Sequence, residues 1–484
     1  SLTFQHRAGV IMPRLYAFAF KSLQILTLLF FVMTLIYSLQ FLITEPKYDH
    51  PYFLIVALIV ILIGIIFMSI IVNRFFTQTQ FIIFICLLAF TLRLAWVLTV
   101  QTNVVQDFAQ MYNGAVDAAN NNFSFADKAY FTTWVYQLGF TMYQAGVIKL
   151  FGEGVLAIKL LNILYCTGIT YFIYRIATHL FNEFSGRVAA LIFATYIPNI
   201  MMTSVLTNQH LATFLFYGGF YLLVKKGISH SYTWIFVSIL IAFGDIMRPI
   251  GIVILLALIL FLLITHIIGD KKLNKKMVVS KLIGMIGIYY IVHFIFSYSL
   301  IATGVTQYPL SSRDPYWKFV VGFNPETTGG FSFPDHKLVF QYPIGEERFE
   351  IEKQLIKERT SDKGQLLLLF KDKFKIMWGD YDAAIYWGLE GHPKPELSKL
   401  LWTLEKLCYV SICIFACIAS IKTIKEQRNK TLLFFSLLIL GYAGVHFFIE
   451  IQSRYRYFII PTFMIIQGYG VYLVTQYIKE RFRA

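Results

Sequence analysis

The sequence predicts an all-α polytopic membrane protein with about twelve transmembrane helices and a small mixed domain on the outer side of the membrane. Three observations lead to this prediction. Apolar residues make up 57% of the 484 residues and charged residues only 14%, whereas a soluble domain is about one half apolar and one quarter charged. The apolar residues are gathered in long runs, and the mean hydropathy is +0.63. The segments on one side of those runs hold far more basic than acidic residues.

The spans follow from the length of the apolar runs. A membrane-spanning helix needs about 20 mostly apolar residues. Twelve stretches approach or exceed this length, and two of them are short enough to be one wrongly divided pair. The predicted spans are residues 17–43, 52–72, 81–100, 154–176, 187–206, 209–224, 233–248, 250–268, 280–301, 399–420, 431–449 and 457–477.

The orientation follows from the distribution of Lys and Arg over short loops. With the N-terminus taken as cytoplasmic, the inside segments hold twenty basic residues against four acidic ones. This surplus accounts for the formal net charge of +15, so it reports topology and contact with anionic lipids, and no nucleic-acid partner is needed. Both termini are therefore predicted to be cytoplasmic.

Residues 130–150 are apolar enough to be taken for a further span. A crossing there would turn the basic clusters at 271–276 and 422–430 outward, against the charge rule. The segment also contains Trp134, Tyr136 and Tyr143, which suit an interface. We therefore predict an interfacial or re-entrant element on the outer surface.

Residues 302–398 form the second polar segment predicted to lie outside. They carry nearly balanced charge and many aromatic residues, and a disordered linker would be poor in aromatics. We expect a small folded domain with amphipathic helices near 346–360 and 362–378. The predicted domains are an N-terminal transmembrane module (1–301) with a first outer loop (101–153), an extracytoplasmic soluble domain (302–398) and C-terminal transmembrane helices (399–484).

Asp107 is the leading candidate for a catalytic residue. It lies in the first long polar interval, residues 101–130, and the three apolar runs before it contain no carboxylate. A carboxylate placed just outside the membrane can act as a general base. The alternative is that Asp107 caps the N-terminus of the amphipathic helix that follows it. Asp117 and Asp127 are more typical of solvated loop acids.

Arg454 and Arg456 flank Tyr455 at the outer end of the last predicted span, and Arg248 lies near the outer end of an earlier one. A guanidinium group pairs well with a phosphate, so we assign these arginines to phosphate binding. The alternative is a basic anchor among lipid headgroups. Further candidate substrate contacts are Tyr112, Asn208, His210, Asp245, Glu450 and Tyr455.

No cofactor is expected, and a divalent cation has only weak support, because neither a His/Cys cluster nor a D-x-D pair occurs near Asp107. All five cysteines lie within apolar runs. We therefore expect neither a disulfide nor a cysteine-based metal site.

Five stretches together resemble the GT-C superfamily of membrane glycosyltransferases, most closely the family 39-like members of the protein mannosyltransferase and aminoarabinose transferase kind. The resemblance covers roughly residues 81–484 and rests on the order of the motifs and on their common placement at the outer face. The stretches are VVQDFAQMYNGA (104–115), VIKLFGEGVLAIKLLNILY (147–165), LIFATYIPNIMMTSVLTNQHLATFLF (191–216), IMRPIG (246–251) and QSRYRYFIIP (452–461).

The resemblance implies a membrane glycosyltransferase (EC 2.4 class) that moves a sugar from a polyprenyl-phosphate donor to an acceptor hydroxyl, with inversion. Asp107 would be the base, and Arg454 and Arg456 would line the substrate cavity. The implied acceptor is a cell-envelope glycan, lipid or protein. The predicted orientation places the active site on the outer face, and the near absence of eukaryotic features such as an outer disulfide favours the plasma membrane of a bacterium. The chain departs from the family pattern at Asn208 and Gln209, where a second acid is usual, and in the two spans before residue 81.

Two other classes of function stay open. A ligase or polymerase that joins whole lipid-linked glycans would use the same lipid-phosphate leaving group. A flippase or transporter of lipid-linked glycans is the other alternative, although midplane binding sites on broken helices and paired internal repeats, which are typical of transporters, are not evident in the sequence.

Overall fold

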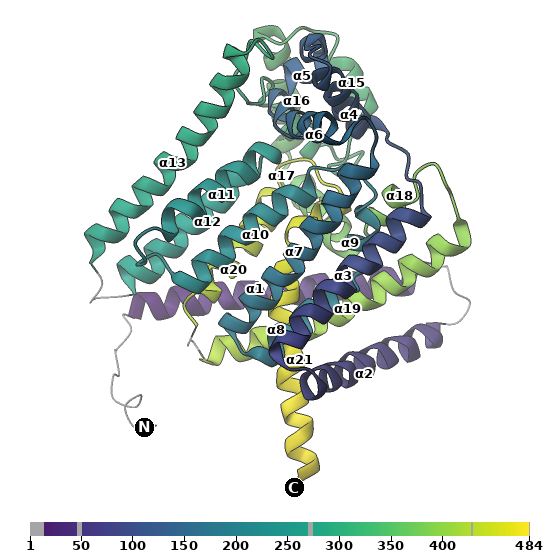
Figure 1. The fold of residues 1–484 in the computed structure, drawn as a ribbon, viewed down its shortest axis with the longest axis vertical. Coiled ribbons are helices and arrows are strands. Elements are labelled where there is room, and N and C mark those ends of the chain that lie inside the picture. Colours follow the sequence, from purple (N-terminus) through teal and green to yellow (C-terminus); the bar gives the residue numbers. More distant parts are fainter. Residues whose placement is uncertain (1–13, 46–50, 270–273, 427–428, 484) are drawn as a thin grey trace.

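The computed structural model describes residues 14–45, 51–269, 274–426 and 429–483. These residues form helices and connecting loops without a β-strand; one isolated bridge joins Trp134 to Ser312. Most helices pack into one bundle, and shorter helices gather at one of its ends (Figure 1). The predicted all-α class is therefore confirmed for the described part of the chain.

The longer helices, of twelve residues or more, account for most of the bundle. They are α1 (Arg14–Thr44), α2 (Pro51–Phe75), α3 (Gln78–Thr99), α4 (Gln106–Ala119), α6 (Leu138–Phe151), α7 (Leu156–Leu180), α8 (Glu183–Ala194), α10 (Gln209–Lys226), α11 (Thr233–Met247), α12 (Gly251–Leu262), α13 (Lys275–Ala302), α16 (Glu346–Ser361), α17 (Lys363–Phe374), α19 (Pro395–Glu426), α20 (Leu432–Val445) and α21 (Ile460–Arg483).

Shorter elements connect them. They are α5 (Ala129–Thr133), α9 (Ile197–Met202), α14 (Trp317–Gly322), α15 (Phe333–Val339), α18 (Ala384–Gly388), the 3-10 helices η1 (Ser124–Asp127), η2 (Val135–Gln137) and η5 (Ser453–Phe458), and the π-helical turns η3 (Leu263–Ile268) and η4 (Lys375–Gly379).

Seven of the described helices are long and apolar enough to cross a membrane, so the chain is a multi-pass membrane protein. They are Arg14–Thr44, Tyr52–Phe75, Gln78–Thr99, Leu156–Leu180, Gly251–Ile268, Lys275–Ala302 and Pro395–Glu426. Helices α11 and α20 are apolar but shorter. The predicted count of twelve spans is thus not confirmed.

The predicted span 187–206 was wrong, because the structure divides it into α8 and α9. Pro198 lies in the first turn of α9 and has no N–H to continue a helix through this point. The break frees carbonyl groups inside the bundle, and Arg93 of α3 satisfies two of them. Its Nη1 donates to Ala194 O at 2.9 Å and its Nη2 to Phe193 O at 3.1 Å.

Three of the loops predicted to lie inside are held together at one end of the bundle. Arg187 Nη1 donates to Val72 O at 3.1 Å and to Phe76 O at 2.7 Å, and the Asn429 amide donates to Leu180 O. Five charged residues counted for the orientation lie outside the described residues. They are Arg7, Asp270, Lys271, Lys272 and Arg428.

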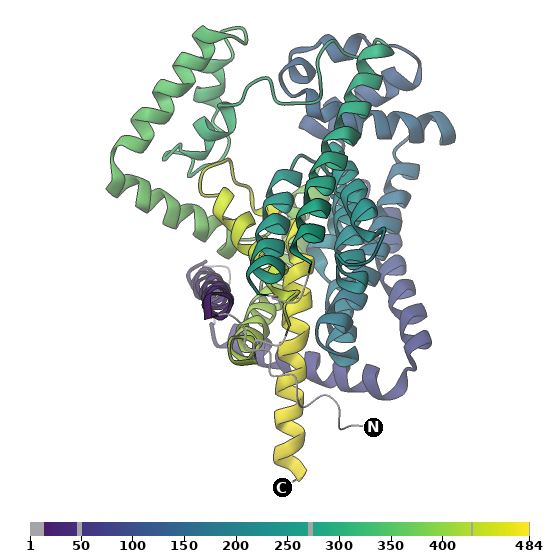
Figure 2. The ribbon, with the colours of Figure 1, turned by 90° about the vertical axis from the view of Figure 1, so that its left-hand side faces the viewer.

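The two polar segments predicted to lie outside share one end of the molecule (Figures 1 and 2). Tyr136 N donates to Ser311 O at 3.1 Å, Arg313 N donates to Thr133 O at 2.9 Å, and Asn103 N donates to Glu390 O at 3.0 Å. Residues 130–150 form α5, η2 and α6, which are too short to span a membrane, and α6 packs on α4. The first outer loop is therefore built against the 303–394 segment.

The 303–394 segment is itself in two parts. One part has a small apolar cluster of its own, made of Trp317, Val320, Val321 and Val339. The two predicted amphipathic helices are also found in this segment: the first is α16, and the second is α17 with η4. By contrast, Trp378 of η4 lies in the main core, 5.0 Å from the ring of Phe30 in α1. The second part therefore belongs structurally to the bundle.

Helices α19 and α21 cross closely at Gly470. A Cβ atom at this position would lie 1.9 Å from Phe415 O, a backbone atom that cannot rotate away. Gly287 on α13 has nothing within 4 Å of the same point. The crossing of these two helices thus depends on the missing side chain.

We predict that Gly470→Ala destabilises the fold by roughly 1–3 kcal/mol, the usual range for an overpacked contact. Gly287→Ala is the control and is expected to be neutral or to stabilise by up to about 1 kcal/mol, since alanine favours a helix. Thermal unfolding of both variants in detergent micelles measures the difference. A Gly470→Ala protein as stable as the Gly287→Ala protein contradicts the close crossing.

Candidate functional site

Asp107 lies in the first turn of α4. The N-cap of this helix is Val105, which makes no side-chain cap hydrogen bond, so the capping alternative for Asp107 does not hold. The Asp107 side chain is exposed, yet the surrounding protein still desolvates it, as expected for a carboxylate recessed at the surface. This burial raises the pKa of Asp107 above its usual value, and the Arg454 guanidinium opposes the shift.

Gln106, directly before Asp107, has a positive φ of 52° although it is not glycine. Such a backbone conformation costs roughly 1–2 kcal/mol and persists only where the surrounding structure enforces it. The strained residue turns the chain into α4 and thereby sets the direction of Asp107. Strain of this kind is common at functional sites.

Arg454 comes from the 3-10 helix η5 and lies among aromatic rings. Its guanidinium carbon is 5.2 Å from the ring centre of Phe108, 5.3 Å from that of Trp387 and 5.3 Å from that of Tyr455. Its Nε donates to Gln452 Oε1 at 2.6 Å, while no described residue accepts a hydrogen bond from its two terminal nitrogens. Arg454 is thus held in place with donors to spare.

Arg248, like Arg454, lies beside the ring of Tyr455. Its guanidinium carbon is 5.2 Å from the Tyr455 ring centre, and its Nη1 donates to Asn208 Oδ1 at 3.1 Å. The amide group of Asn208 in turn donates to Met247 O at 2.9 Å. Asn208 therefore positions Arg248 and is not itself turned to a ligand.

Lys318 and Glu450 complete the site, and the sequence analysis missed Lys318. Glu450 N donates to Lys318 O at 3.1 Å, and the Lys318 ammonium lies 5.3 Å from the ring centre of Tyr136. Burial raises the pKa of Glu450, Gln452, Lys318 and Arg454 lower it, and Asp107 raises it further. The only sequence signal for Lys318 is a single basic residue between Trp317 and Phe319.

We call Asp107, Glu450, Arg248, Arg454 and Lys318 the charged cluster. It brings three cations and two carboxylates together from four separate segments of the chain, since Glu450 and Arg454 belong to the same stretch. The hydroxyl groups of Tyr130 and Tyr136 lie within electrostatic reach of Asp107, and burial with this charge raises the pKa of each, so both stay protonated. The cluster can thus offer a base, fixed positive charge and neutral hydrogen-bond donors at one place.

Arg456 was predicted as a second phosphate ligand, but the structure turns it inward. Its side chain is fully buried, its Nη2 donates to Asp380 O at 2.7 Å and to Ile376 O at 3.3 Å, and its Nε donates to Met377 O. A 3-10 helix has three residues per turn, so residues two apart, such as Arg454 and Arg456, point in different directions. We therefore do not assign Arg456 to phosphate binding.

Three other predicted contacts make structural interactions of their own, although Asp245 also lies within electrostatic reach of Lys318. Tyr112 interacts with Gly154 and Glu153. His210 is buried, with Nδ1 2.5 Å from the Tyr457 hydroxyl and Nε2 2.8 Å from Met202 O. Asp245 pairs with His293 at 2.9 Å and accepts a hydrogen bond from Gly251 N at 2.6 Å. These side chains are occupied by structural contacts.

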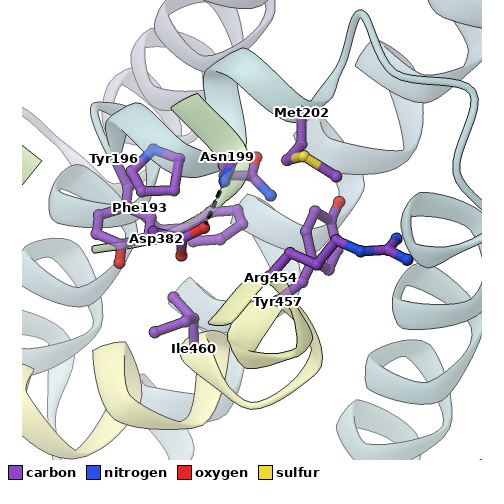
Figure 3. Close-up of a pocket in the computed structure, with 10 residues that line it drawn as sticks. Phe193, Tyr196, Asn199, Met202, Asp382, Arg454, Tyr457 and Ile460 are labelled. Atoms are coloured by element: carbon purple, nitrogen blue, oxygen red, sulfur yellow. Dashed lines mark hydrogen bonds between the residues drawn. The ribbon is translucent and has the colours of Figure 1, made fainter. Parts of the chain in front are cut away.

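A small pocket lies beside Arg454 (Figure 3). It has room for about one water molecule. Tyr196, Asn199, Asp382 and Tyr457 are among its lining residues, and Arg454 extends away from Tyr196 and Asp382 in this view. A pocket of this volume does not hold a sugar.

The part of the chain that the structure describes contains no group of three or more His, Cys, Asp or Glu side chains suited to a metal ion. The two carboxylates of the charged cluster, Asp107 and Glu450, are instead accompanied by three cations, which disfavour a metal ion there. The expectation of a reaction without a cofactor stays a prediction.

Comparison with known proteins supports the resemblance found in the sequence. Residues 138–296 match the family model described as dolichyl-phosphate-mannose-protein mannosyltransferase. The match covers α6 to most of α13 and includes Arg248, but it ends before Lys318 and begins after Asp107. A search of curated proteins gives no match.

We predict that Arg456→Met destabilises the protein by roughly 3–5 kcal/mol, because it leaves the carbonyls of Ile376 and Met377 without their donor and removes one of the two cations beside the buried Asp382. Arg454→Met is the matched variant. It loses one side-chain hydrogen bond and its ring contacts, so it should destabilise by only about 1–2 kcal/mol. Denaturant unfolding in micelles compares the two. Equal stability of both variants would show that Arg456 has no structural role.

Proposed function

Residues 138–296 form a GT-C type glycosyltransferase domain of the dolichyl-phosphate-mannose-protein mannosyltransferase family, and on this premise we propose that the protein transfers a sugar from a polyprenyl-phosphate donor to an acceptor hydroxyl. The reaction takes place at the charged cluster. This cluster lies on the outer face of the membrane in the predicted orientation.

The proposal rests on the relation between Asp107 and Arg454. The two groups come from segments about 350 residues apart and interact electrostatically. Nevertheless no ion pair joins Asp107 to an arginine among the described residues, and the terminal nitrogens of Arg454 have no partner there. A carboxylate and a guanidinium that interact without forming an ion pair are both available to a substrate.

In the proposed mechanism Asp107 takes the proton from the acceptor hydroxyl as a general base. The acceptor oxygen then forms a bond to the anomeric carbon of the donor sugar while the bond from that carbon to the phosphate oxygen breaks. The electron pair of the broken bond leaves with the polyprenyl phosphate. Attack opposite the leaving group inverts the anomeric configuration.

The leaving phosphate gains negative charge as the bond breaks, and fixed cations stabilise this charge in the transition state. We assign this role to Arg454, Arg248 and Lys318. The two arginines are held by Gln452 and Asn208, so little reorganisation is needed during the reaction. We thus assign to Lys318 the phosphate-binding role that the sequence predicted for Arg456.

We predict that Asp107→Asn lowers the rate of transfer by at least about 100-fold, the lower range for a general base, with donor binding retained. Asp117→Asn is the control, because Asp117 belongs to the same helix and lies ten residues from Asp107. The assay uses the full chain in proteoliposomes with a polyprenyl-phosphate sugar. Unchanged transfer by Asp107→Asn removes Asp107 from the mechanism, and translocation of a lipid-linked glycan by this variant favours a flippase.

The acidic limb of the pH–rate profile tests how neighbouring charges change the pKa of Asp107. The base has to be ionised, so kcat/KM falls as the pH drops through the raised pKa of Asp107. Arg454 lowers this pKa, so Arg454→Met should move the limb to higher pH. Asp107 raises the pKa of Glu450, whereas Glu450 is not a cause of the shift at Asp107, so Glu450→Gln should leave the limb in place. A limb that Arg454→Met leaves unmoved, or that Glu450→Gln moves as far, contradicts this electrostatic arrangement.

A further inference from the structure

An apolar groove lies between α1, α17 and the end of α20. None of the residues that line it belongs to the first outer loop. It encloses about 860 Å³ of free space, part of it open to the surroundings. Leu29 and Met33 line it from α1, Phe370 and Lys371 from α17, and Gly444 and Phe447 from α20 and the residues after it. Phe374 and Phe447 stack with their ring centres 6.3 Å apart at one wall.

The surroundings of the groove indicate a hydrocarbon occupant. Helix α1 is a candidate membrane span, and its groove-lining Leu26 and Leu29 are about half exposed. On α17, Leu367 and Leu368 are exposed as well. Large apolar side chains left open beside a span are covered by lipid chains in a membrane.

Lys371 is the one charged side chain among the residues that line the groove. It is exposed, and no described acid forms an ion pair with it. We propose that this groove binds one anionic phospholipid, with a hydrocarbon chain between α1 and α20 and the phosphate of the headgroup beside Lys371. An ammonium near the membrane surface attracts an anionic headgroup and leaves a zwitterionic one nearly unaffected.

This site is separate from the charged cluster, because the last turn of α20 divides them. Ala443, Gly444 and Phe447 face the groove. Tyr442 and His446 lie on the other side of the same turn. Tyr442 interacts with Arg248 of the charged cluster, and the ring of His446 lies 6.1 Å from the ring of Tyr455, which adjoins the cluster. A lipid in the groove therefore does not occupy the place of the donor phosphate.

The groove is nevertheless coupled to the charged cluster through Lys373. Its ammonium donates to Gly322 O, Phe447 O and Ile449 O, each at 2.8 Å, which fastens α17 to the chain leading into Glu450. Burial lowers the pKa of Lys373 to about 7, and the Glu450 carboxylate opposes this. A lipid that stabilises α17 therefore also stabilises the segment that carries Glu450 and Arg454.

Gly444 offers a direct test. A Cβ atom there meets nothing within 4 Å and Gly444 lines the groove, so Gly444→Phe is expected to occupy groove space with its ring, and Gly287→Phe on α13 adds the same ring at another position that is open for a Cβ atom. Native mass spectrometry of the full chain with dioleoylphosphatidylglycerol should show one retained lipid in wild type and in Gly287→Phe, and none in Gly444→Phe. The lipid should raise the Tm of the first two proteins only.

The charge is tested by Lys371→Ala, with Lys357→Ala on α16 as the control. Loss of one basic residue near an anionic headgroup should weaken binding of the same lipid about fivefold, the equivalent of about 1 kcal/mol. The control should bind as wild type does. The proposal is overturned if Gly444→Phe retains the lipid, if dioleoylphosphatidylcholine binds equally well, or if polyprenyl phosphate displaces the lipid from wild type. None of these readouts depends on transfer activity.

Discussion

The carbonyl groups around the π-helical turn η4 have to be hydrogen-bonded inside the bundle, where no bulk water reaches them. Two buried cations do this. Arg456 donates to the carbonyl of Asp380 at 2.7 Å, and Lys406 of α19 donates to the same carbonyl, also at 2.7 Å. Since Arg456 is fixed inward, the 3-10 geometry of η5 sends Arg454 the other way, toward Asp107. The position of the candidate site thus depends on a backbone requirement within the core.

The charged cluster combines accessibility with partial desolvation. Its five side chains come from α4, α14, η5 and two loops, and each belongs to an element anchored elsewhere by packing or hydrogen bonds. Because protein surrounds them, charges act more strongly on one another than they would in water. Burial raises the pKa of Asp107 and that of Glu450, and Arg454 opposes both shifts. A recessed site of this kind favours a reaction in which charge moves from a base to a leaving group.

Hydropathy and charge were enough to predict a multi-pass helical protein, and the position of Asp107 after three apolar runs was enough to single it out. The other details depend on contacts that periodicity does not encode. Pro198 breaks a run that looks continuous in composition, and the division between Arg454 and Arg456 depends on a 3-10 turn. Lys318 is far from the other members in sequence, so only the fold brings it to Glu450.

The last turn of α20 and the chain after it have two faces of opposite character. Gly444 and Phe447 border an apolar groove, whereas Tyr442 and His446 adjoin buried charge. Because the apolar and polar side chains lie on opposite faces of this short segment, a hydrocarbon chain in the groove is kept apart from a phosphate at the charged cluster, at the same depth of the protein. Lys373 bonds to carbonyls on this boundary, so a displacement of α17 has to displace the segment that carries the site as well. The enzyme we propose would therefore depend on its lipid surroundings through packing, even where the lipid takes no part in the chemistry.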